Sequence, residues 1–304
     1  MISMRPLRSS LTVPGSSLRF LEKAKSIVVD QLILDLEDSV TLGEKDQART
    51  KLVDVLKAGG FTSAVAVRIN SATSEIGRRD LEVAKSASQT DSFALIIPKV
   101  ESPDSLNEIC NTLLKIEKDG GRQPYSIKLQ VQIESALGLS RIFEIASSCK
   151  RIQALVFGPG DFAASLGMRV TNIGERPQDL EGLDPYYFPL MLILTAAKAN
   201  GLYAIDGPFS DLKDEPGLKK SCLRSALLGF DGKWAIHPSQ IPIIESEFSP
   251  SQEEFDRANK IVDSLKNAGS SGAIVVDGHM IDEATRKLAQ ATIARGIAAG
   301  MKRK

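Results

Sequence analysis

Short apolar segments rich in β-branched residues recur along the chain, and most are followed by a stretch whose apolar positions have helical spacing. Several are apolar at consecutive positions, as at 32–34 and 95–97, which is typical of parallel strands covered on both faces. The pattern predicts strands at 7–13, 31–36, 64–69, 93–98, 128–133, 154–157, 202–205 and 233–236. Eight β/α units favour an α/β fold of the (β/α)8 TIM-barrel type over a doubly wound sheet.

The chain continues well beyond the eighth predicted strand, to residue 304. A helix is predicted at 251–268, with Ser251 and Glu254 as a capping box, and an amphipathic helix at 282–301. The glycine- and serine-rich segment 269–272 predicts a hinge between them. We therefore expect a catalytic barrel at 1–248 and a C-terminal helical lid or arm at 249–304. The polar stretch 167–184 predicts a long loop near the barrel mouth.

Composition narrows the choice of partners. The chain has 38 basic and 38 acidic residues and is 42% hydrophobic, so the basic surface that drives binding to nucleic acid or acidic membranes is missing. No apolar run approaches the length of a membrane span, and the first ten residues lack the apolar core of a signal peptide. Cys110, Cys149 and Cys222 are far apart, which predicts three unpaired cysteines in a reducing compartment. The expectation is a cytoplasmic enzyme.

Polar residues follow the predicted strands at the end where TIM barrels build their active sites. Any one of them could be a solvated loop charge or a helix cap, but their recurrence after all eight strands favours a shared site. The residues are Pro14, Gly15, Glu37, Asp38, Arg68, Asn70, Lys99, Glu134, Asp161, Asp206 and His237.

Glu134 and Asp161 end the neighbouring fifth and sixth predicted strands, so their carboxylates should project into the same barrel mouth. Two converging carboxylates make an oxygen-only site that leaves coordination positions for water and substrate, which suits Mg²⁺ and admits Mn²⁺. The alternative is that one of them, Asp161 in particular, caps the helix that follows it.

Arg68 ends the third predicted strand inside an apolar run, so its guanidinium needs a partner. A substrate carboxylate or thioester oxygen would serve, and a structural pair with Glu37 or Asp38 is the alternative. Lys99 is interpreted as a structural or substrate-orienting residue, and His237, which precedes a proline, as a hydrogen-bonded turn residue.

Taken together, the motifs resemble those of the citrate lyase β-subunit-like family, the CoA-ester lyase branch of the HpcH/HpaI aldolase superfamily. The similarity runs nearly end to end, and segments 204–209 and 232–238 look most like the malyl-CoA lyases of that family. The motifs are SLTVPG at 10–15, LDLED at 34–38, VRIN at 67–70, IPKVE at 97–101, QIE at 132–134, VFG at 156–158, GKWAIHPSQ at 232–240 and VDGHMID at 276–282.

The resemblance implies a role for each candidate residue. It places the Mg²⁺ ligands on Glu134 and Asp161 and the substrate-binding arginine on Arg68. It places the outer acidic pair, which holds metal-bound water, on Glu37 and Asp38.

The resemblance further implies that Arg19 and Lys25 meet the phosphates of CoA, although both also fit an ordinary helix face. It implies a homotrimer or homohexamer in which Asp282 covers the barrel of a neighbouring subunit; from the residues alone Asp282 fits the N-cap of the last helix. There it would protonate an enolate carbon, with its pKa raised by desolvation.

The implied activity is Mg²⁺-dependent cleavage or formation of a carbon–carbon bond in a 3-hydroxyacyl-CoA that carries a second carboxylate. Malyl-CoA, β-methylmalyl-CoA and citramalyl-CoA fit this description, with an acyl-CoA and glyoxylate or pyruvate as products. The alternatives are a citrate lyase β-type subunit, a metal aldolase acting without CoA, and a non-catalytic barrel that binds a partner.

Overall fold

Eight parallel strands close into a barrel in the computed structural model, which describes residues 6–89, 93–170, 172–174, 184–267 and 273–303. The strands follow one another in chain order, and β8 pairs with β1 to close the ring. The prediction of a (β/α)8 TIM barrel is confirmed. The strands are β1 (Ser9–Pro14), β2 (Gln31–Asp35), β3 (Ala64–Arg68), β4 (Phe93–Ile97), β5 (Lys128–Ile133), β6 (Ile152–Phe157), β7 (Tyr203–Asp206) and β8 (Gly232–Ala235).

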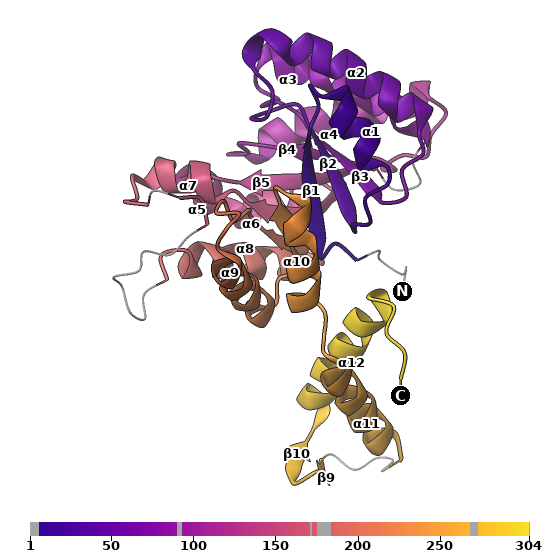
Figure 1. Ribbon diagram of the computed structural model, residues 1–304, viewed down its shortest axis with the longest axis vertical. Helices are drawn as coiled ribbons and strands as arrows, with labels where there is room; N and C mark the ends of the chain where they lie inside the picture. Colours follow the sequence, from indigo (N-terminus) through magenta and orange to yellow (C-terminus); the bar gives the residue numbers. More distant parts are fainter. Residues whose placement is uncertain (1–5, 90–92, 171, 175–183, 268–272, 304) are drawn as a thin grey trace.

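Helices surround the barrel (Figure 1). The α-helices of this outer layer are α1 (Leu18–Ala24), α2 (Lys45–Ala58), α3 (Glu75–Asp80), α4 (Pro103–Asp119), α5 (Ala136–Ser140), α6 (Ile142–Ser147), α7 (Pro159–Leu166), α8 (Tyr187–Ala199), α9 (Glu215–Leu228) and α10 (Ile241–Glu247). Three 3₁₀ helices, η1 (Leu42–Glu44), η2 (Leu81–Gln89) and η3 (Pro238–Gln240), complete it.

The strands are buried on both faces, which explains their runs of consecutive apolar residues. Ile33 belongs to a cluster inside the barrel, with Ala66, Ile96, Ile205 and Trp234, whereas its neighbours on either side pack outward against the helices. Because side chains alternate between the two faces of a strand, this inner cluster fixes which strand-end residues point into the mouth.

The last elements form an arm that extends away from the barrel (Figure 1). It contains α11 (Gln252–Asn267), a two-stranded sheet of β9 (Ile274–Val276) and β10 (His279–Ile281), and α12 (Glu283–Ala298). Ala258, Ile261, Ile281 and Ala289 give the arm its own small apolar core. Gly296 lets α12 approach α11 closely, because a Cβ there would lie 2.2 Å from the ring of Phe255.

The start of the arm helix agrees with its predicted capping box. The backbone N–H of Ser251 donates to Glu254 at 2.8 Å, and the backbone N–H of Glu254 donates to the Ser251 hydroxyl at 3.1 Å. The predicted hinge at 269–272 lies outside the described residues, as does most of the predicted loop at 167–184.

The prediction of three unpaired cysteines is wrong. Cys110 in α4 and Cys149 just after α6 form a disulfide with a sulfur–sulfur distance of 2.18 Å, and Cys222 is free and buried. The pairing escapes a reading of the sequence because the two cysteines are 39 residues apart. Packing of α4 beside α6 on the outside of the barrel brings them together.

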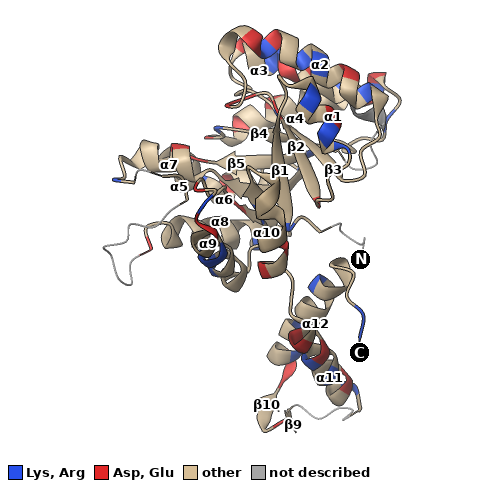
Figure 2. Cartoon of the chain, in the orientation of Figure 1, with Lys and Arg blue, Asp and Glu red and all other residues tan. Residues whose placement is uncertain are grey.

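Basic and acidic residues are interspersed over the helices of this chain of zero net charge (Figure 2). Within the described residues, every helix is too short or too polar to span a bilayer.

Candidate active site

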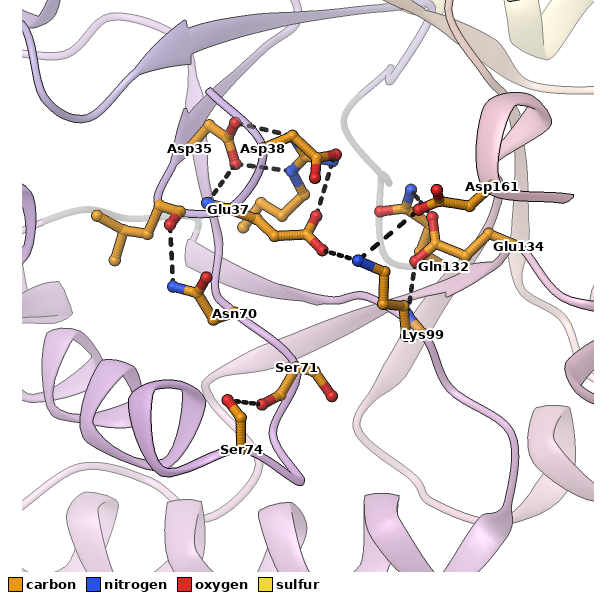
Figure 3. Close-up of polar contacts among 12 residues, drawn as sticks. Asp35, Glu37, Asp38, Asn70, Ser71, Ser74, Lys99, Gln132, Glu134 and Asp161 are labelled. Atoms are coloured by element: carbon orange, nitrogen blue, oxygen red, sulfur yellow. Dashed lines mark hydrogen bonds and ion pairs between the residues drawn. The ribbon is translucent and has the colours of Figure 1, made fainter. Parts of the chain in front are cut away.

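The carboxyl ends of β2 to β6 bring the candidate residues together at one mouth of the barrel (Figure 3). A cavity of about 390 Å³ opens there, and Arg68, Glu134, Asp161 and Trp234 contribute to its lining. The alternation of side chains explains this convergence. Asp35 follows the inward-facing Ile33 by two residues, and Arg68 follows the inward-facing Ala66 by two.

Arg68 is held in a fixed orientation by carboxylates. Its Nε and Nη2 each donate to Asp35 at 2.7 Å, and the β2–β3 register sets these two residues side by side. Its Nη1 lies 3.0 Å from both Glu37 Oε2 and Asp38 Oδ2, and its guanidinium stands 5.4 Å from the ring centre of Trp234. The pair with Glu37 and Asp38 that we considered is therefore present.

Asp35, the main partner of Arg68, is absent from the sequence-based candidates. The feature of the sequence that could have identified Asp35 is its position between two leucines in an otherwise apolar strand. Burial works to raise the pKa of Asp35, but the hydrogen bonds and charge of Arg68 outweigh it and lower that pKa. Burial likewise opposes the charge of Arg68, and the carboxylates around it raise its pKa.

Glu134 follows β5 and is almost fully buried. It accepts hydrogen bonds from the backbone N–H of Lys99 at 2.7 Å and from the side-chain amide of Gln132 at 2.5 Å. Burial, together with the charges of Glu37 and Asp161, raises the pKa of Glu134 to about 8. Gly158 permits this packing, since a Cβ there would lie 2.5 Å from the Glu134 Cβ.

Asp161 lies in the first turn of α7 and faces the cavity. The alternative that Asp161 caps this helix is not supported, because the N-cap position is Gly158 and no side chain caps it. Half of the Asp161 side chain is exposed, so solvent or a ligand can reach its carboxylate. The dipole of α7 favours a negative charge at this position.

Lys99 occupies the space between these acidic groups (Figure 3). Its Nζ donates to Glu37 Oε1 at 2.9 Å and lies 3.8 Å from Asp161 Oδ2. Its backbone has a φ of 54°, in the left-handed region that residues other than glycine rarely adopt. Lys99 is thus a member of the site, whereas the sequence left its role open between structure and substrate orientation.

The donor set fits Mg²⁺. Glu134 and Asp161 supply carboxylate oxygens, and the buried Glu37 Oε2 accepts no hydrogen bond from the described residues, its contact there being the ion pair with Arg68 at 3.0 Å. Within the described ranges, no three acidic, histidine or cysteine side chains form a closed cage. An arrangement of two carboxylates around open positions is what Mg²⁺ requires, since it keeps several waters or substrate oxygens.

Arg19 lies in α1, and Lys25 directly follows that helix as its C-cap. The Arg19 guanidinium lies 5.3 Å from the ring centre of Phe20, and Lys25 pairs with Glu22 at 3.0 Å. Neither residue lines the cavity at the barrel mouth as the described residues define it, and their predicted contact with CoA stays a prediction.

Asp282 is the N-cap of α12, as the residue pattern indicated. Its carboxylate accepts from the backbone N–H and the hydroxyl of Thr285, both at 2.9 Å. These bonds lower the pKa of Asp282 in the single chain, whereas the resemblance implied a raised value. The arm that contains α12 extends away from the barrel (Figure 1), and Asp282 is not among the described residues that line the cavity at the mouth.

The expectation that all eight strand ends share one site is too broad. Asp206 follows the inward-facing Ile205 by one residue and therefore points outward, where it bonds Lys233 at 2.7 Å and Ser225 at 2.6 Å. His237 is a turn residue, as predicted, with its Nδ1 2.8 Å from the Ser239 hydroxyl.

A TIM barrel that gathers two carboxylates and a buried arginine around a cavity at the carboxyl ends of its strands has the arrangement of an enzyme active site. The chain belongs to the HpcH/HpaI aldolase/citrate lyase family, whose model matches residues 8–238. This confirms the predicted family and, with it, the predicted class of carbon–carbon lyase.

Relatives and solved structures cover nearly the whole chain. The L-malyl-CoA/beta-methylmalyl-CoA lyase of Cereibacter sphaeroides is 33% identical over 300 residues, which are 95% of this chain and 94% of that protein. The (3S)-malyl-CoA thioesterase of the same organism is 34% identical over 96% of this chain and 95% of its own length. The crystal structure of CitE from Mycobacterium tuberculosis in complex with magnesium, acetoacetate and coenzyme A has a TM-score of 0.76 and 27% identity, covering 99% of this chain and 100% of that one.

Proposed function

We propose that the protein is a Mg²⁺-dependent lyase that cleaves or forms a carbon–carbon bond in a 3-hydroxy-dicarboxyl-CoA thioester. Malyl-CoA, β-methylmalyl-CoA and citramalyl-CoA are the candidate substrates, with an acyl-CoA and glyoxylate or pyruvate as products. The observation that carries the proposal is the convergence of Glu134, Asp161 and a carboxylate-clamped Arg68 on one cavity. The names of the lyase and CitE relatives support the choice of substrate and metal.

Glu134 and Asp161 would hold the metal, with Glu37 and Asp38 beside them as acceptors for its waters. A bound Mg²⁺ supplies Lewis acidity toward hydroxyl and carbonyl oxygens, and Mn²⁺ is proposed as a substitute. Glu134 is already positioned by the Lys99 N–H and the Gln132 amide. These bonds hold one ligand in place before the metal arrives, which favours binding.

Arg68 would bind the thioester oxygen and stabilise the enolate that forms when the carbon–carbon bond breaks. Asp35 fixes the guanidinium through its Nε and Nη2 atoms, so the remaining nitrogen, Nη1, has one orientation relative to the cavity. A donor that is fixed before charge develops stabilises the transition state more than one that must reorient. Because Asp38 is largely exposed, its side chain can move away from Nη1 and let a substrate oxygen bind there.

Asp282 would protonate the enolate carbon, or remove its proton in the condensing direction, after delivery by a neighbouring subunit. A groove of about 720 Å³ between α9 and the arm supports self-association, because it is lined by exposed leucines. Leu227 and Leu288 are 78% and 71% exposed in the single chain. We assign this groove to a second copy of the chain in a homotrimer or homohexamer. Burial there would act against the lowered pKa of Asp282.

The phosphates of CoA are proposed to meet Arg19 and Lys25. The second candidate function is that of a citrate lyase β-type subunit, which cleaves a citryl thioester to oxaloacetate and an acetyl thioester. The similarity to CitE over 99% of the chain supports this second candidate. The (3S)-malyl-CoA thioesterase relative makes hydrolysis of the thioester a third activity to assay.

One incubation separates these functions. Purified protein with Mg²⁺ is given malyl-CoA, β-methylmalyl-CoA, citramalyl-CoA or citryl-CoA, and the released oxo acid and free CoA are measured. Glyoxylate or pyruvate with acyl-CoA supports the lyase, oxaloacetate supports the citrate lyase type, and free CoA without an oxo acid indicates a thioesterase. Absence of all three products, with Mg²⁺ binding intact, would refute the proposal.

The origin of the proton donor has its own test. Asp282→Asn and Arg68→Ala are each inactive on this proposal, and chains of the two variants are dissociated, mixed and reassociated. Activity should return in part, because some interfaces then pair an intact barrel with an intact arm. Mixed oligomers without any recovery would place Asp282 outside the neighbouring site.

A further inference from the structure

The acidic side chains at the mouth outnumber the cations that balance them. Asp35, Glu37, Asp38, Glu134 and Asp161 supply five carboxylates. Arg68 balances the group around Asp35, and its ion pairs within the described part of the chain are those with Asp35, Glu37 and Asp38. The half of the cluster that contains the two proposed metal ligands therefore receives no positive charge by ion pairing with Arg68.

Lys99 provides that charge from the opposite side of the cluster. Its ammonium lies 2.9 Å from Glu37 Oε1 and 3.8 Å from Asp161 Oδ2, so it bridges residues that follow two different strands. The same residue donates its backbone N–H to Glu134 at 2.7 Å. One residue thus contacts both proposed metal ligands and the carboxylate beside them.

The left-handed backbone makes this double contact possible. With a φ of 54°, Lys99 turns its N–H toward Glu134 while its side chain extends across the mouth to Glu37. An unfavourable conformation in a residue other than glycine persists only where its surroundings hold it, and such residues cluster at functional sites. Here the contacts that hold it are those to the acidic cluster.

We infer that Lys99 is an internal counter-ion of the metal site, whose ammonium holds the carboxylates together and competes with the divalent cation for them. This inference rests on the proposed function, because it takes Glu134 and Asp161 as the metal ligands. Lys99 is in this account a positioning residue. Its positive charge, a few ångströms from the carboxylates, lowers their affinity for Mg²⁺. The same charge holds these carboxylates close together when no metal is bound.

Lys99→Gln tests the inference, because glutamine keeps the backbone N–H and much of the length but removes the charge. Lys198→Gln is the matched control: the Lys198 side chain is 45% exposed against 47% for Lys99, and it pairs with Asp231 at 2.6 Å on the far end of α8. Mg²⁺ affinity is measured by titration calorimetry, and the melting temperature is measured in EDTA and in excess Mg²⁺.

The Mg²⁺ dissociation constant of Lys99→Gln should fall about tenfold, and its melting temperature in EDTA should drop below that of the wild type. Lys198→Gln should leave the dissociation constant unchanged. An unchanged or weaker affinity in Lys99→Gln would overturn the inference. If that variant unfolds on chelation while Lys198→Gln does not, the role in holding the mouth together is supported.

Lys99→Arg is the second comparison, because it changes the shape of the side chain but keeps its positive charge. It should bind Mg²⁺ with nearly wild-type affinity, and a tenfold gain there would assign the effect to side-chain shape and contradict the inference. Failure of the proposed function is a different result, since the wild-type protein would then bind no Mg²⁺ at the site or release no oxo acid.

Discussion

Replacing Glu134 with glutamine is expected to stabilise the metal-free protein while abolishing its affinity for Mg²⁺. The pKa of Glu134 is raised from 4.5 to about 8, mainly by burial and further by the charges of Glu37 and Asp161. Between these two pH values the folded protein keeps a proton that the unfolded chain has released. The free energy of unfolding therefore falls as the pH rises from the lower to the higher value.

The magnitude follows from the width of that interval. At pH 7 the solution is about 2.5 pH units above the ordinary pKa, and about 1.4 kcal/mol per unit gives a loss of about 3 kcal/mol in the wild type. Glutamine carries no charge and avoids this loss. The amide oxygen of the new glutamine can accept from the Lys99 N–H. Its amide N–H₂ can donate to Gln132 Oε1 once the Gln132 amide turns over, because that oxygen is buried and accepts no hydrogen bond within the described residues.

Urea unfolding in EDTA, followed by circular dichroism at about pH 5 and about pH 8, measures the difference between wild type and Glu134→Gln. The advantage of the variant should grow with pH and then reverse in excess Mg²⁺, which stabilises only the wild type. Glu144→Gln, in an exposed ion pair with Arg141, is the control and should show no such trend. A variant that is no more stable than the wild type at the higher pH would refute the reasoning.

Three further substitutions probe the site. Asp161→Ala should lose Mg²⁺-dependent turnover yet change the free energy of unfolding by less than about 0.5 kcal/mol, because its side chain is half exposed; full activity in the presence of EDTA would contradict the metal assignment. Arg68→Lys loses the parallel bonds to Asp35 and should lower kcat/KM at least about 100-fold in steady-state assays, whereas near-wild-type kinetics would leave Arg68 a simple electrostatic role. Gly158→Ala should raise the Mg²⁺ dissociation constant about tenfold by calorimetry, since its Cβ would lie 2.5 Å from that of Glu134, and an unchanged constant would show that the mouth can relax.

The barrel and the convergence of Glu134 with Asp161 could be predicted because both depend on the order of strands along the chain. Parallel strands buried on both faces leave long apolar runs, and neighbouring strands end at the same rim. The direction of each side chain was not predicted, and Asp206 was wrongly placed at the mouth; the structure supplies the reason. Asp206 is one residue past the inward-facing Ile205, so the alternation of a strand excludes it from the mouth.

Other parts of the site depend on contacts between segments that a sequence does not display. The pairing of Arg68 with Asp35 requires the β2–β3 register, and the place of Lys99 requires a left-handed backbone that nothing in its side chain predicts. The Cys110–Cys149 disulfide likewise follows from helix packing on the outside of the barrel. In each case the sequence showed a residue of the pair but did not show which residue it contacts.

The clamp of Asp35 on Arg68 has a consequence for the entropy of substrate binding. A free arginine side chain samples many rotamers, and fixing it on a ligand costs up to about 2 kcal/mol of conformational entropy. Here folding has already fixed these torsions, since both Nε and Nη2 are bound and the guanidinium stands over Trp234. A substrate that meets the Nη1 edge orders no further torsion of Arg68, and its binding free energy remains available for orienting the reacting carbons.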